Sequence, residues 1–439
     1  MSSEGEGSRI TMITLGCAKN LVDSERVLGR LNQYGIEVHH DRPPSEGDVV
    51  VVNTCGFIRP AQEESIDTIL HLAEARRKNK IRKLIVMGCL VERFRKVLAS
   101  EIPEVDHWVG SNQLEAVVRQ VLSTTTRDSW HHHITRYRLT PRHYAYLKIA
   151  EGCNRPCAFC AIPQMRGRFV SKPIDELVTE AQELIQHGVR ELILIAQDTT
   201  YYGIDLYGKR KLADLLVQLA DLPGLQWIRL HYAFPSGFPM EVIKVMRDHP
   251  NICNYLDIPL QHVATPILRR MRRGIDKSKT YELIHRIRDL HPEIAIRSTF
   301  MVGFPGETDE DFEQLLIFLE TMKLDRVGVF TYSHEEGTLA YSFADDVPEA
   351  IKQQRANQLM ELQRQISYEQ QQRWVGQHLT VILDEPRGTV WGGRTEYDSP
   401  EVDNEVIVEG LSNGTVGQFA SVKVTMADEY SLTATATEE

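Results

Sequence analysis

The sequence predicts an α/β protein of three domains: an N-terminal parallel α/β domain, a central open β/α barrel of six strand–helix units, and a small C-terminal antiparallel β-barrel. Its 439 residues are too many for one ordinary core. Strand-like and helical patterns alternate up to residue 372, whereas the last segment has only short apolar runs between turn residues. We therefore place the domains at residues 8–123, 144–372 and 373–439, with a linker at 124–143.

The first domain alternates apolar runs with helical patterns, which is typical of parallel strands covered by helices on both faces. The polar segment Ser123–His143 has no apolar period and is predicted to be a linker. Its His131–His133 run offers metal ligands, although its composition favours an exposed linker. The predicted strands are Ile10–Leu15, Val49–Asn53 and Lys83–Met87, and the predicted helices are Leu21–Tyr34, Ala61–Arg77 and Leu114–Leu122.

Six strand-like runs in the central domain predict an open barrel that is smaller than the eight-unit kind, with its chemistry at the carboxyl ends of the strands. Asp309–Glu320 is the clearest helix, because its apolar residues recur at i, i+3, i+4 and i+7. Thr308 is its predicted N-cap, with Asp311 three residues further on. The predicted strands are Tyr146–Ala150, Glu191–Ala196, Trp227–Tyr232, Tyr255–Leu260, Ala295–Val302 and Arg326–Tyr332, and a glutamine-rich helix follows at Gln353–Gln372.

The last domain has short alternating runs separated by Gly, Pro, Asn and Asp, which predict a small antiparallel barrel. The chain has a net charge of −11, and residues 373–439 contribute −8 of it, with four basic and twelve acidic side chains. Such an acidic module repels phosphate and favours a basic partner, although acids also simply keep a surface soluble. The predicted strands are Leu379–Leu383, Val406–Val408, Ala420–Val424 and Ser431–Ala434.

The chain is expected to be cytoplasmic. Its first residues, Met1–Ile10, are polar and acidic, unlike a secretory signal. Apolar runs such as Val49–Val52 have the length of a strand rather than of a membrane span. Seven cysteines, an odd number, argue against a pure disulfide framework, so spaced cysteines indicate metal binding or catalysis.

Three cysteines lie in one loop after the first predicted barrel strand. The segment Glu151–Cys160 reads EGCNRPCAFC, so Cys153, Cys157 and Cys160 are spaced C-x3-C-x2-C. Zinc sites and ferredoxin clusters usually use four protein ligands. Three thiolates instead hold three irons of a cubane and leave the fourth iron open to the amino and carboxylate groups of a methionine sulfonium. The competing interpretation is a zinc or inert-thiol loop.

This loop and the barrel resemble the radical S-adenosylmethionine (SAM) superfamily, whose motif is C-x3-C-x-aromatic-C, with Phe159 at the aromatic position. The resemblance covers about Tyr144–Arg373 and implies a TIM-like radical SAM barrel with a 4Fe-4S cluster. It also implies that one electron from this cluster cleaves SAM to a 5′-deoxyadenosyl radical, while the protein supplies positioning.

Three further cysteines each follow a predicted strand of the first domain, in ITMITLGC, VVVVNTC and KLIVMGC. The carboxyl ends of parallel strands share one edge of a sheet, so these thiols are expected to converge and hold a second cluster with one free iron. Buried strand-end cysteines are common, however, and Cys253, which has no partner pattern, is assigned to packing. The proposed auxiliary ligands are Cys17, Cys55 and Cys89, flanked by Gly16, Gly56 and Gly88.

The motifs LGCAKN, NTCGFI and MGCLVER, followed by the radical loop and a TRAM-like β-barrel, closely resemble the methylthiotransferases over nearly the whole chain. The resemblance implies two 4Fe-4S clusters, SAM as radical source and methyl donor, and an external electron donor. It also implies that the auxiliary cluster carries the methylated sulfur that replaces a hydrogen of the substrate. No catalytic residue is assigned beyond the cluster ligands.

Several strand ends offer further site residues. Gln197 and Asp198 follow the second barrel strand and are expected to contact SAM, as are Arg297, Ser298 and Thr299 on the fifth strand. Asn20 either shapes the auxiliary edge or caps a helix. Gly303, Gly306 and Glu307 are expected to form the strand-to-helix turn, although relatives contact adenine there. His231 and Gln261 end other strands and either line the cavity or are merely structural.

Two methylthiotransferase branches fit, one acting on a tRNA adenosine and the other on an aspartate β-carbon of protein twelve of the small ribosomal subunit. TRAM modules commonly bind RNA, yet here Trp391 and Tyr397 lie among acids. The expected partner is therefore a basic ribosomal protein, and the C-terminal domain is not expected to bind RNA directly. QDTTYYG at Gln197–Gly203 and YSHEEGT ending at Thr338 also resemble the ribosomal-protein branch. A non-catalytic two-cluster electron carrier or redox sensor is the alternative from another class, although carriers usually have four cysteines per cluster.

Overall fold

The computed structural model describes residues 9–122 and 136–437. They form two compact units. The first contains the described residues up to Thr140 together with Glu151–Asn154 and Cys160–Val170, and the second contains the rest. The segment with the three loop cysteines therefore contributes to both units, which are described separately below.

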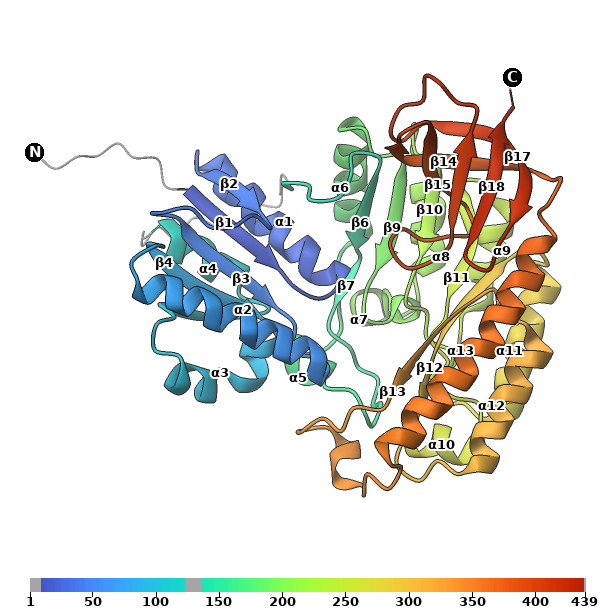
Figure 1. The fold of residues 1–439 in the computed structure, drawn as a ribbon, viewed down its shortest axis with the longest axis horizontal. Coiled ribbons are helices and arrows are strands. Elements are labelled where there is room, and N and C mark those ends of the chain that lie inside the picture. Colours follow the sequence, from blue (N-terminus) through green and yellow to red (C-terminus); the bar gives the residue numbers. More distant parts are fainter. Residues whose placement is uncertain (1–8, 123–135, 438–439) are drawn as a thin grey trace, which may run out of the picture. The chain divides into compact units, whose positions relative to one another are not determined.

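A five-stranded, fully parallel sheet in the order β2-β1-β3-β4-β5 forms the centre of the first unit (Figure 1). Helices cover both of its faces, as predicted. The strands are β1 (Arg9–Thr14), β2 (Glu37–His40), β3 (Val49–Thr54), β4 (Lys83–Gly88) and β5 (His107–Gly110), and the helices are α1 (Ala18–Gln33), α2 (Arg59–Arg77), α3 (Cys89–Glu101) and α4 (Leu114–Leu122).

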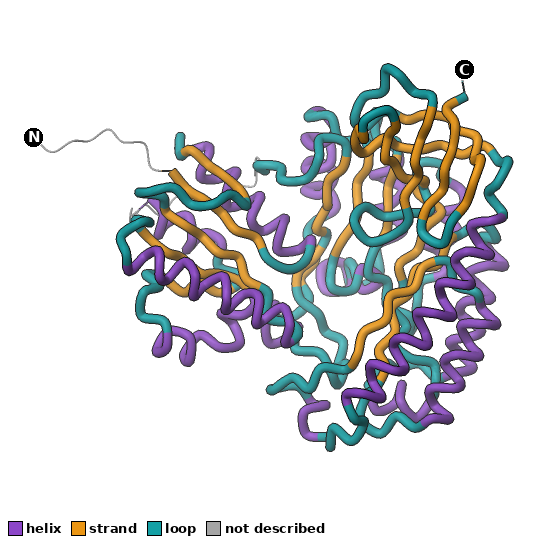
Figure 2. The backbone as a smooth tube through the Cα atoms, in the orientation of Figure 1, coloured by secondary structure: helices purple, strands orange, loops and turns teal. Residues whose placement is uncertain are grey.

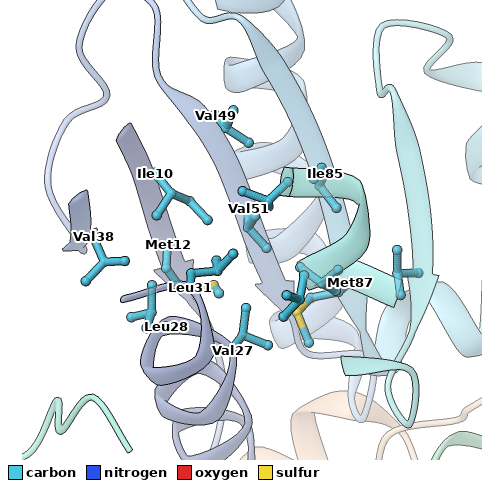
Figure 3. Packing of buried hydrophobic residues seen from close by; sticks show 14 residues of the cluster. Ile10, Met12, Val27, Leu28, Leu31, Val38, Val49, Val51, Ile85 and Met87 are labelled. Atoms are coloured by element: carbon cyan, nitrogen blue, oxygen red, sulfur yellow. The ribbon is translucent and has the colours of Figure 1, made fainter. Parts of the chain in front are cut away.

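The alternation of side chains along β3 explains the two helix layers. Val49 and Val51 pack with residues of α1 and α4, as Figure 3 shows for Val27, Leu28 and Leu31 of α1. Val50 and Val52 point to the other face and pack with residues of α2 and α3. Every residue of β3 is buried, because a strand covered on both faces has no solvent side. The short edge strands β2 and β5 and the helix α3 are additional to the predicted elements.

Six parallel strands in the consecutive order β13-β12-β11-β10-β9-β6 form an open β/α barrel in the second unit, which confirms the predicted fold class (Figure 2). β11 begins three residues earlier than predicted and ends before Pro259, which has no N–H for the ladder. The strands are β6 (Tyr144–Lys148), β9 (Glu191–Ile195), β10 (Trp227–Leu230), β11 (Ile252–Asp257), β12 (Ala295–Val302) and β13 (Arg326–Thr331).

Helices alternate with these strands along the chain. The predicted N-cap is confirmed, because Thr308 and Asp311 form a reciprocal capping box at the start of α12. The helices are α6 (Ile174–Gln186), α8 (Leu212–Ala220), α9 (Met240–Asp248), α11 (Lys277–Leu290), α12 (Asp309–Met322) and α13 (Glu349–Gln372). The short elements are β7 (Ala150–Glu151), α5 (Ile162–Arg166), β8 (Val170–Ser171), η1 (Thr199–Tyr201), α7 (Ile204–Tyr207), α10 (Thr265–Arg270) and η2 (Leu339–Ser342).

The C-terminal strands close into a five-stranded barrel in the order β14-β15-β16-β18-β17. The prediction of an antiparallel barrel is wrong for one pair, since β16 and β18 run parallel. A closed ring with an odd number of strands cannot alternate direction throughout, so one neighbouring pair has to be parallel. The strands are β14 (His378–Arg387), β15 (Val390–Thr395), β16 (Glu405–Glu409), β17 (Phe419–Ala427) and β18 (Ser431–Ala436).

Several acids of the C-terminal barrel pair with cations inside the second unit. Asp398 accepts hydrogen bonds from Arg326 at the start of β13, and Asp403 accepts one from Arg297 of β12 at 3.1 Å. Asp384 accepts one from Arg394 at 2.8 Å. The charge of −8 in this segment is therefore not all exposed surface charge, because these three carboxylates are neutralised within the fold.

The histidine run of the predicted linker lies outside the described residues. The described end of the linker is held to the first unit, because Arg136 donates hydrogen bonds to the carboxylate of Glu25 and the backbone N–H of Leu139 donates one to it at 2.8 Å. Among the described helices, none combines the length and the apolar character needed to cross a membrane.

Candidate functional site

The three N-terminal cysteines lie at the carboxyl edge of the five-stranded sheet. Cys17 is the N-cap of α1, Cys55 follows β3 directly, and Cys89 is the first residue of α3 after β4. Their thiols are close enough to interact electrostatically, each with the other two. The structure therefore brings together the three side chains that the strand-end pattern predicted to converge.

Glycines beside these cysteines allow the close approach. A Cβ on Gly16, whose φ is +91°, would lie 2.8 Å from Cβ of Cys55 and 3.1 Å from its sulfur. A Cβ on Gly56 would lie 2.7 Å from the backbone of Leu90. A Cβ at either position would force its neighbours to shift, so the glycines let these loops pack closely together.

Burial makes two of these thiols poor acids in the protein without metal. It raises the pKa of Cys55, and it raises the pKa of Cys89 to about 11, while the guanidinium of Arg166 acts in the opposite direction on both. A metal centre would have to displace these protons, because thiolates rather than thiols bind metal.

Asn20 ties the loops of this edge together. It lies within α1 and is not its cap; its Nδ2 donates hydrogen bonds to the carbonyl oxygens of Leu15 at 2.8 Å and Thr54 at 3.1 Å. These carbonyls belong to the end of β3 and the loop after β1. Of the two interpretations of Asn20, shaping the edge is therefore confirmed.

The first unit also brings Arg166, at the end of α5, to this edge. Its Nε donates a hydrogen bond to the sulfur of Cys89 at 3.2 Å, and its Nη1 donates one to Asp23 at 2.6 Å. Sequence reasoning missed Arg166 and Asp23. Neither lies in a recognised motif, and a buried arginine is not distinguishable in sequence from an exposed one.

Within the first unit, the loop around Cys153 is held by backbone contacts. The N–H of Cys153 donates a hydrogen bond to the carbonyl oxygen of Gly167 at 3.1 Å. Gly152 has a φ of +79°, and a Cβ there would lie 2.1 Å from the carbonyl oxygen of Arg168. Only glycine fits at this position, so the turn before Cys153 requires Gly152.

N–H groups point at the other two loop sulfurs. Arg273, which is buried in the second unit, donates a hydrogen bond from Nη1 to the sulfur of Cys157 at 3.3 Å. In the first unit, the backbone N–H of Ile162 donates one to the sulfur of Cys160 at 3.4 Å. Hydrogen bonds to cysteine sulfur are typical of iron–sulfur sites, where they stabilise the negative charge of the cluster.

Within residues 9–122 and 136–437, no three His, Cys, Asp or Glu side chains are grouped closely enough to hold one metal ion. A cubane cluster binds each thiolate through a different iron, so its ligands stand further apart than those of a zinc ion. The three thiols at the sheet edge and the N–H groups that donate to cysteine sulfur are of the kinds that hold a 4Fe-4S cluster.

The predicted SAM contacts lie at different depths of the barrel. Asp198, just past the end of β9, is buried and accepts a hydrogen bond from Arg155 of the cysteine loop at 2.6 Å. Gln197 precedes it. Ser298 is buried in mid-strand, where its hydroxyl donates a hydrogen bond to the carbonyl of Ile258 at 2.9 Å. The neighbouring Thr299 bonds through its carbonyl oxygen to the backbone N–H of Gln261.

The guanidinium of Arg297 is engaged in ion pairs with Asp257 and Asp403, each at 3.1 Å. His231 is also engaged, because its Nε2 lies 2.9 Å from the hydroxyl of Ser399. Both partners Asp403 and Ser399 follow β15, so these two candidates join the C-terminal barrel to the β/α barrel. Cavity lining is therefore not the role that the structure gives to His231.

The structural alternatives hold for several other candidates. Gly303, Gly306 and Glu307 form the turn from β12 to α12, where the N–H of Gly303 donates a hydrogen bond to the carboxylate of Glu307 at 2.9 Å. Gln261 pairs through its backbone with β12. Cys253 is buried in an apolar cluster with Trp227, Tyr255 and Ile382, which confirms its assignment to packing.

Three family models match the chain in succession. Residues 9–110 match "Uncharacterized protein family UPF0004", residues 147–319 match the radical SAM superfamily, and residues 375–437 match the TRAM domain. Membership of the radical SAM superfamily implies a 4Fe-4S cluster and SAM as cofactors.

Solved structures show the same fold. The radical SAM methyltransferase TsrM from Kitasatospora setae, solved with tryptophan and a SAM analogue, matches with a TM-score of 0.54 at 14% identity over 74% of this chain and 73% of that one. The cobalamin-dependent SAM radical enzyme OxsB matches with a TM-score of 0.52 at 11% identity over 82% of this chain and 56% of that one. At such identities the likeness concerns the fold alone.

Curated relatives match the whole chain. A ribosomal protein uS12 methylthiotransferase RimO from Flavobacterium johnsoniae is 51% identical over 97% of both chains, and that from Cytophaga hutchinsonii is 48% identical over 98% of this chain and 99% of the relative. That from Porphyromonas gingivalis is 49% identical over 97% of this chain and 98% of the relative. With the two cysteine trios and the fold, these identities show that the chain belongs to the ribosomal protein uS12 methylthiotransferase family of radical SAM enzymes.

Proposed function

We propose that this chain transfers a methylthio group to ribosomal protein uS12 and thereby replaces a C–H bond at an aspartate β-carbon with C–S–CH3. The full-length identity of about half to enzymes named for this activity carries the proposal. The finer assignment to aspartate rests on the resemblance of the sequence motifs to the ribosomal-protein branch.

The two cysteine trios have different roles in this proposal. Cys153, Cys157 and Cys160 hold the cluster that reacts with SAM, and Cys17, Cys55 and Cys89 hold a second 4Fe-4S cluster that carries the sulfur. When bound, the first cluster passes on an electron from an external donor, and this electron cleaves SAM. A second SAM supplies the methyl group. The protein orients the sulfurs, through Arg273 at Cys157 and through Arg166 at Cys89.

We further propose that SAM binds inside the β/α barrel, with Gln197 and Asp198 just past β9 and Ser298 and Thr299 in the middle of β12 as its polar contacts. The ion pair of Asp198 with Arg155 supports this position, because Arg155 lies between the first two cysteines of the loop. Arg297 is a less suitable contact, since its guanidinium is already paired with two carboxylates.

The C-terminal barrel supports a protein partner over RNA. RNA-binding barrels use exposed cations and stacking aromatics. Here Arg394 is buried between Glu191 and Asp384, and Tyr397 is buried against Trp374 with ring centroids 4.9 Å apart. Exposed acids such as Glu409 suit a basic ribosomal protein.

The substrate can be tested with reconstituted enzyme, SAM, reductant and a sulfide source. Parallel reactions contain purified uS12, 30S subunits or unmodified tRNA, and intact-mass spectrometry reports the added methylthio group. We expect the gain on uS12 or the subunit, at one aspartate. A gain on tRNA alone would reject the proposal in favour of tRNA adenosine modification.

The same reactions distinguish an enzyme from an electron carrier or redox sensor. A radical SAM enzyme releases 5′-deoxyadenosine from SAM on reduction, whereas a carrier releases none. Cys253→Ala is the matched control for the six cluster cysteines, because Cys253 packs in an apolar cluster that contains none of them. We expect this variant to release 5′-deoxyadenosine as the wild type does, and Cys157→Ala to release none.

A further inference from the structure

The side chain of Arg166 is almost fully buried in the first unit, with 4% of its surface exposed. It is the last residue of α5 and lies six residues after Cys160. Its planar guanidinium donates in three directions: to the sulfur of Cys89 at 3.2 Å, to the carboxylate of Asp23 at 2.6 Å and to the side-chain oxygen of Asn20.

Arg166 has more hydrogen-bond partners than a simple ion pair with one carboxylate would require. Asp23 alone would neutralise the guanidinium, and both side chains are nearly inaccessible to water. Glu151, immediately before the cysteine loop, adds a second carboxylate at 3.3 Å. Nε is nevertheless turned to a sulfur, and a thiol is a weak acceptor for a buried cation. A thiolate bound to a cluster is a much better partner, because charge-assisted hydrogen bonds are the strong ones.

We propose that Arg166 is a positioning residue of the auxiliary cluster: it fixes the sulfur of Cys89 for metal binding and raises the reduction potential of the cluster. This inference rests on the proposed function, in that it requires a cluster on Cys17, Cys55 and Cys89. A buried positive charge and an N–H···S hydrogen bond both stabilise the more negative, reduced state.

The positions of these three acceptors require the planar, branched guanidinium group of arginine. One guanidinium places separate N–H groups on Cys89, Asp23 and Asn20, whereas the ammonium of lysine is a single point with three donors. Asn20 in turn bonds the loops after β1 and β3. Arg166 thus links the segment that follows Cys160 to the loops that carry the auxiliary cysteines.

The reduction potential of the auxiliary cluster tests the inference. In full-length protein with Cys153, Cys157 and Cys160 changed to alanine, only the auxiliary cluster can assemble, and a redox titration followed by EPR gives its potential. We expect Arg166→Gln to lower the potential and Asp23→Asn to raise it, because they remove opposite charges. Arg166→Lys should lower it less than Arg166→Gln. Arg168→Gln, an exposed arginine in the same segment, is the matched control and should leave it unchanged.

Opposite shifts from Arg166→Gln and Asp23→Asn would not arise from a merely structural loss. An Arg166→Gln potential equal to that of Arg168→Gln would overturn the inference and leave the proposed function intact. If Arg166→Gln assembles no cluster, Asp23→Asn decides alone: a higher potential supports the inference and an unchanged one overturns it. Absence of any cluster from the parent protein, by iron analysis, would overturn the inference and the auxiliary-cluster proposal together.

Discussion

Arg394 donates a hydrogen bond from Nη2 to the carboxylate of Glu191 at 2.9 Å, across 203 residues of sequence. Glu191 is the first residue of β9 and also accepts a hydrogen bond from Nε of Arg229 at 2.8 Å. One fully buried carboxylate thus pairs with two buried guanidinium groups where the C-terminal barrel meets the β/α barrel, and Asp384 supplies a second negative charge to Arg394.

Replacing this carboxylate should destabilise the protein strongly. Glu191→Gln keeps the shape of the side chain but leaves Arg229 and Arg394 without its charge, and breaking a buried pair costs about 3–5 kcal/mol. We expect a lower thermal unfolding midpoint by calorimetry. Glu409→Gln, at an exposed carboxylate of β16, is the matched control and should unfold at the wild-type temperature. Equal midpoints for the two variants would contradict a stabilising role of Glu191.

Glu191 also predicts a dependence of stability on pH. Burial raises the pKa of its carboxyl group, but the guanidiniums of Arg394 and Arg229 outweigh burial, so the pKa lies below the ordinary value of 4.5. A lowered folded-state pKa stabilises the protein above about pH 4.5, and this stabilisation is lost as the pH falls through the folded pKa. The difference in unfolding midpoint between wild type and Glu191→Gln should therefore shrink on acidification. A constant difference from neutral pH to about pH 3 would count against this linkage.

The two cysteine trios should lose iron independently. We expect Cys153→Ala and Cys55→Ala each to retain about half of the wild-type iron and sulfide, because each removes a ligand of one cluster only. Anaerobic purification, iron and sulfide analysis and EPR provide the measurement. Cys253→Ala should retain all of the iron. Full iron content in Cys55→Ala would show that the N-terminal trio holds no cluster.

A substitution of Arg297 tests whether this side chain stabilises the fold or binds SAM. Arg297→Gln leaves Asp257 and Asp403 without their cation, and we expect a loss of about 2 kcal/mol in unfolding free energy, since the arginine is partly exposed. SAM affinity, measured by equilibrium dialysis, should change less than about twofold. Arg286→Gln, on the exposed face of α11, is the control for stability. If Arg297→Gln lost SAM binding while its unfolding free energy stayed unchanged, Arg297 would instead be a SAM contact.

Local features of the fold could be predicted from the amino-acid sequence. Alternating apolar patterns predicted both parallel sheets, because the burial of strands and helices follows their own periodicity. Thr308 and Asp311 predicted the start of α12, since a capping box involves only residues that are close in sequence. The strand-end positions of Cys17, Cys55 and Cys89 predicted their convergence, because parallel strands bring their carboxyl ends to one edge.

Contacts between residues far apart in sequence could not be predicted and became known from the folded chain. The parallel pairing of β16 with β18 follows from closing an odd number of strands, and the −8 charge of the C-terminal segment is partly neutralised by arginines of the β/α barrel. Arg166 reaches Cys89 across 77 residues. The periodic pattern of apolar residues does not predict such contacts. The partners of a buried charge depend on which segments pack together in the fold, not on their spacing along the chain.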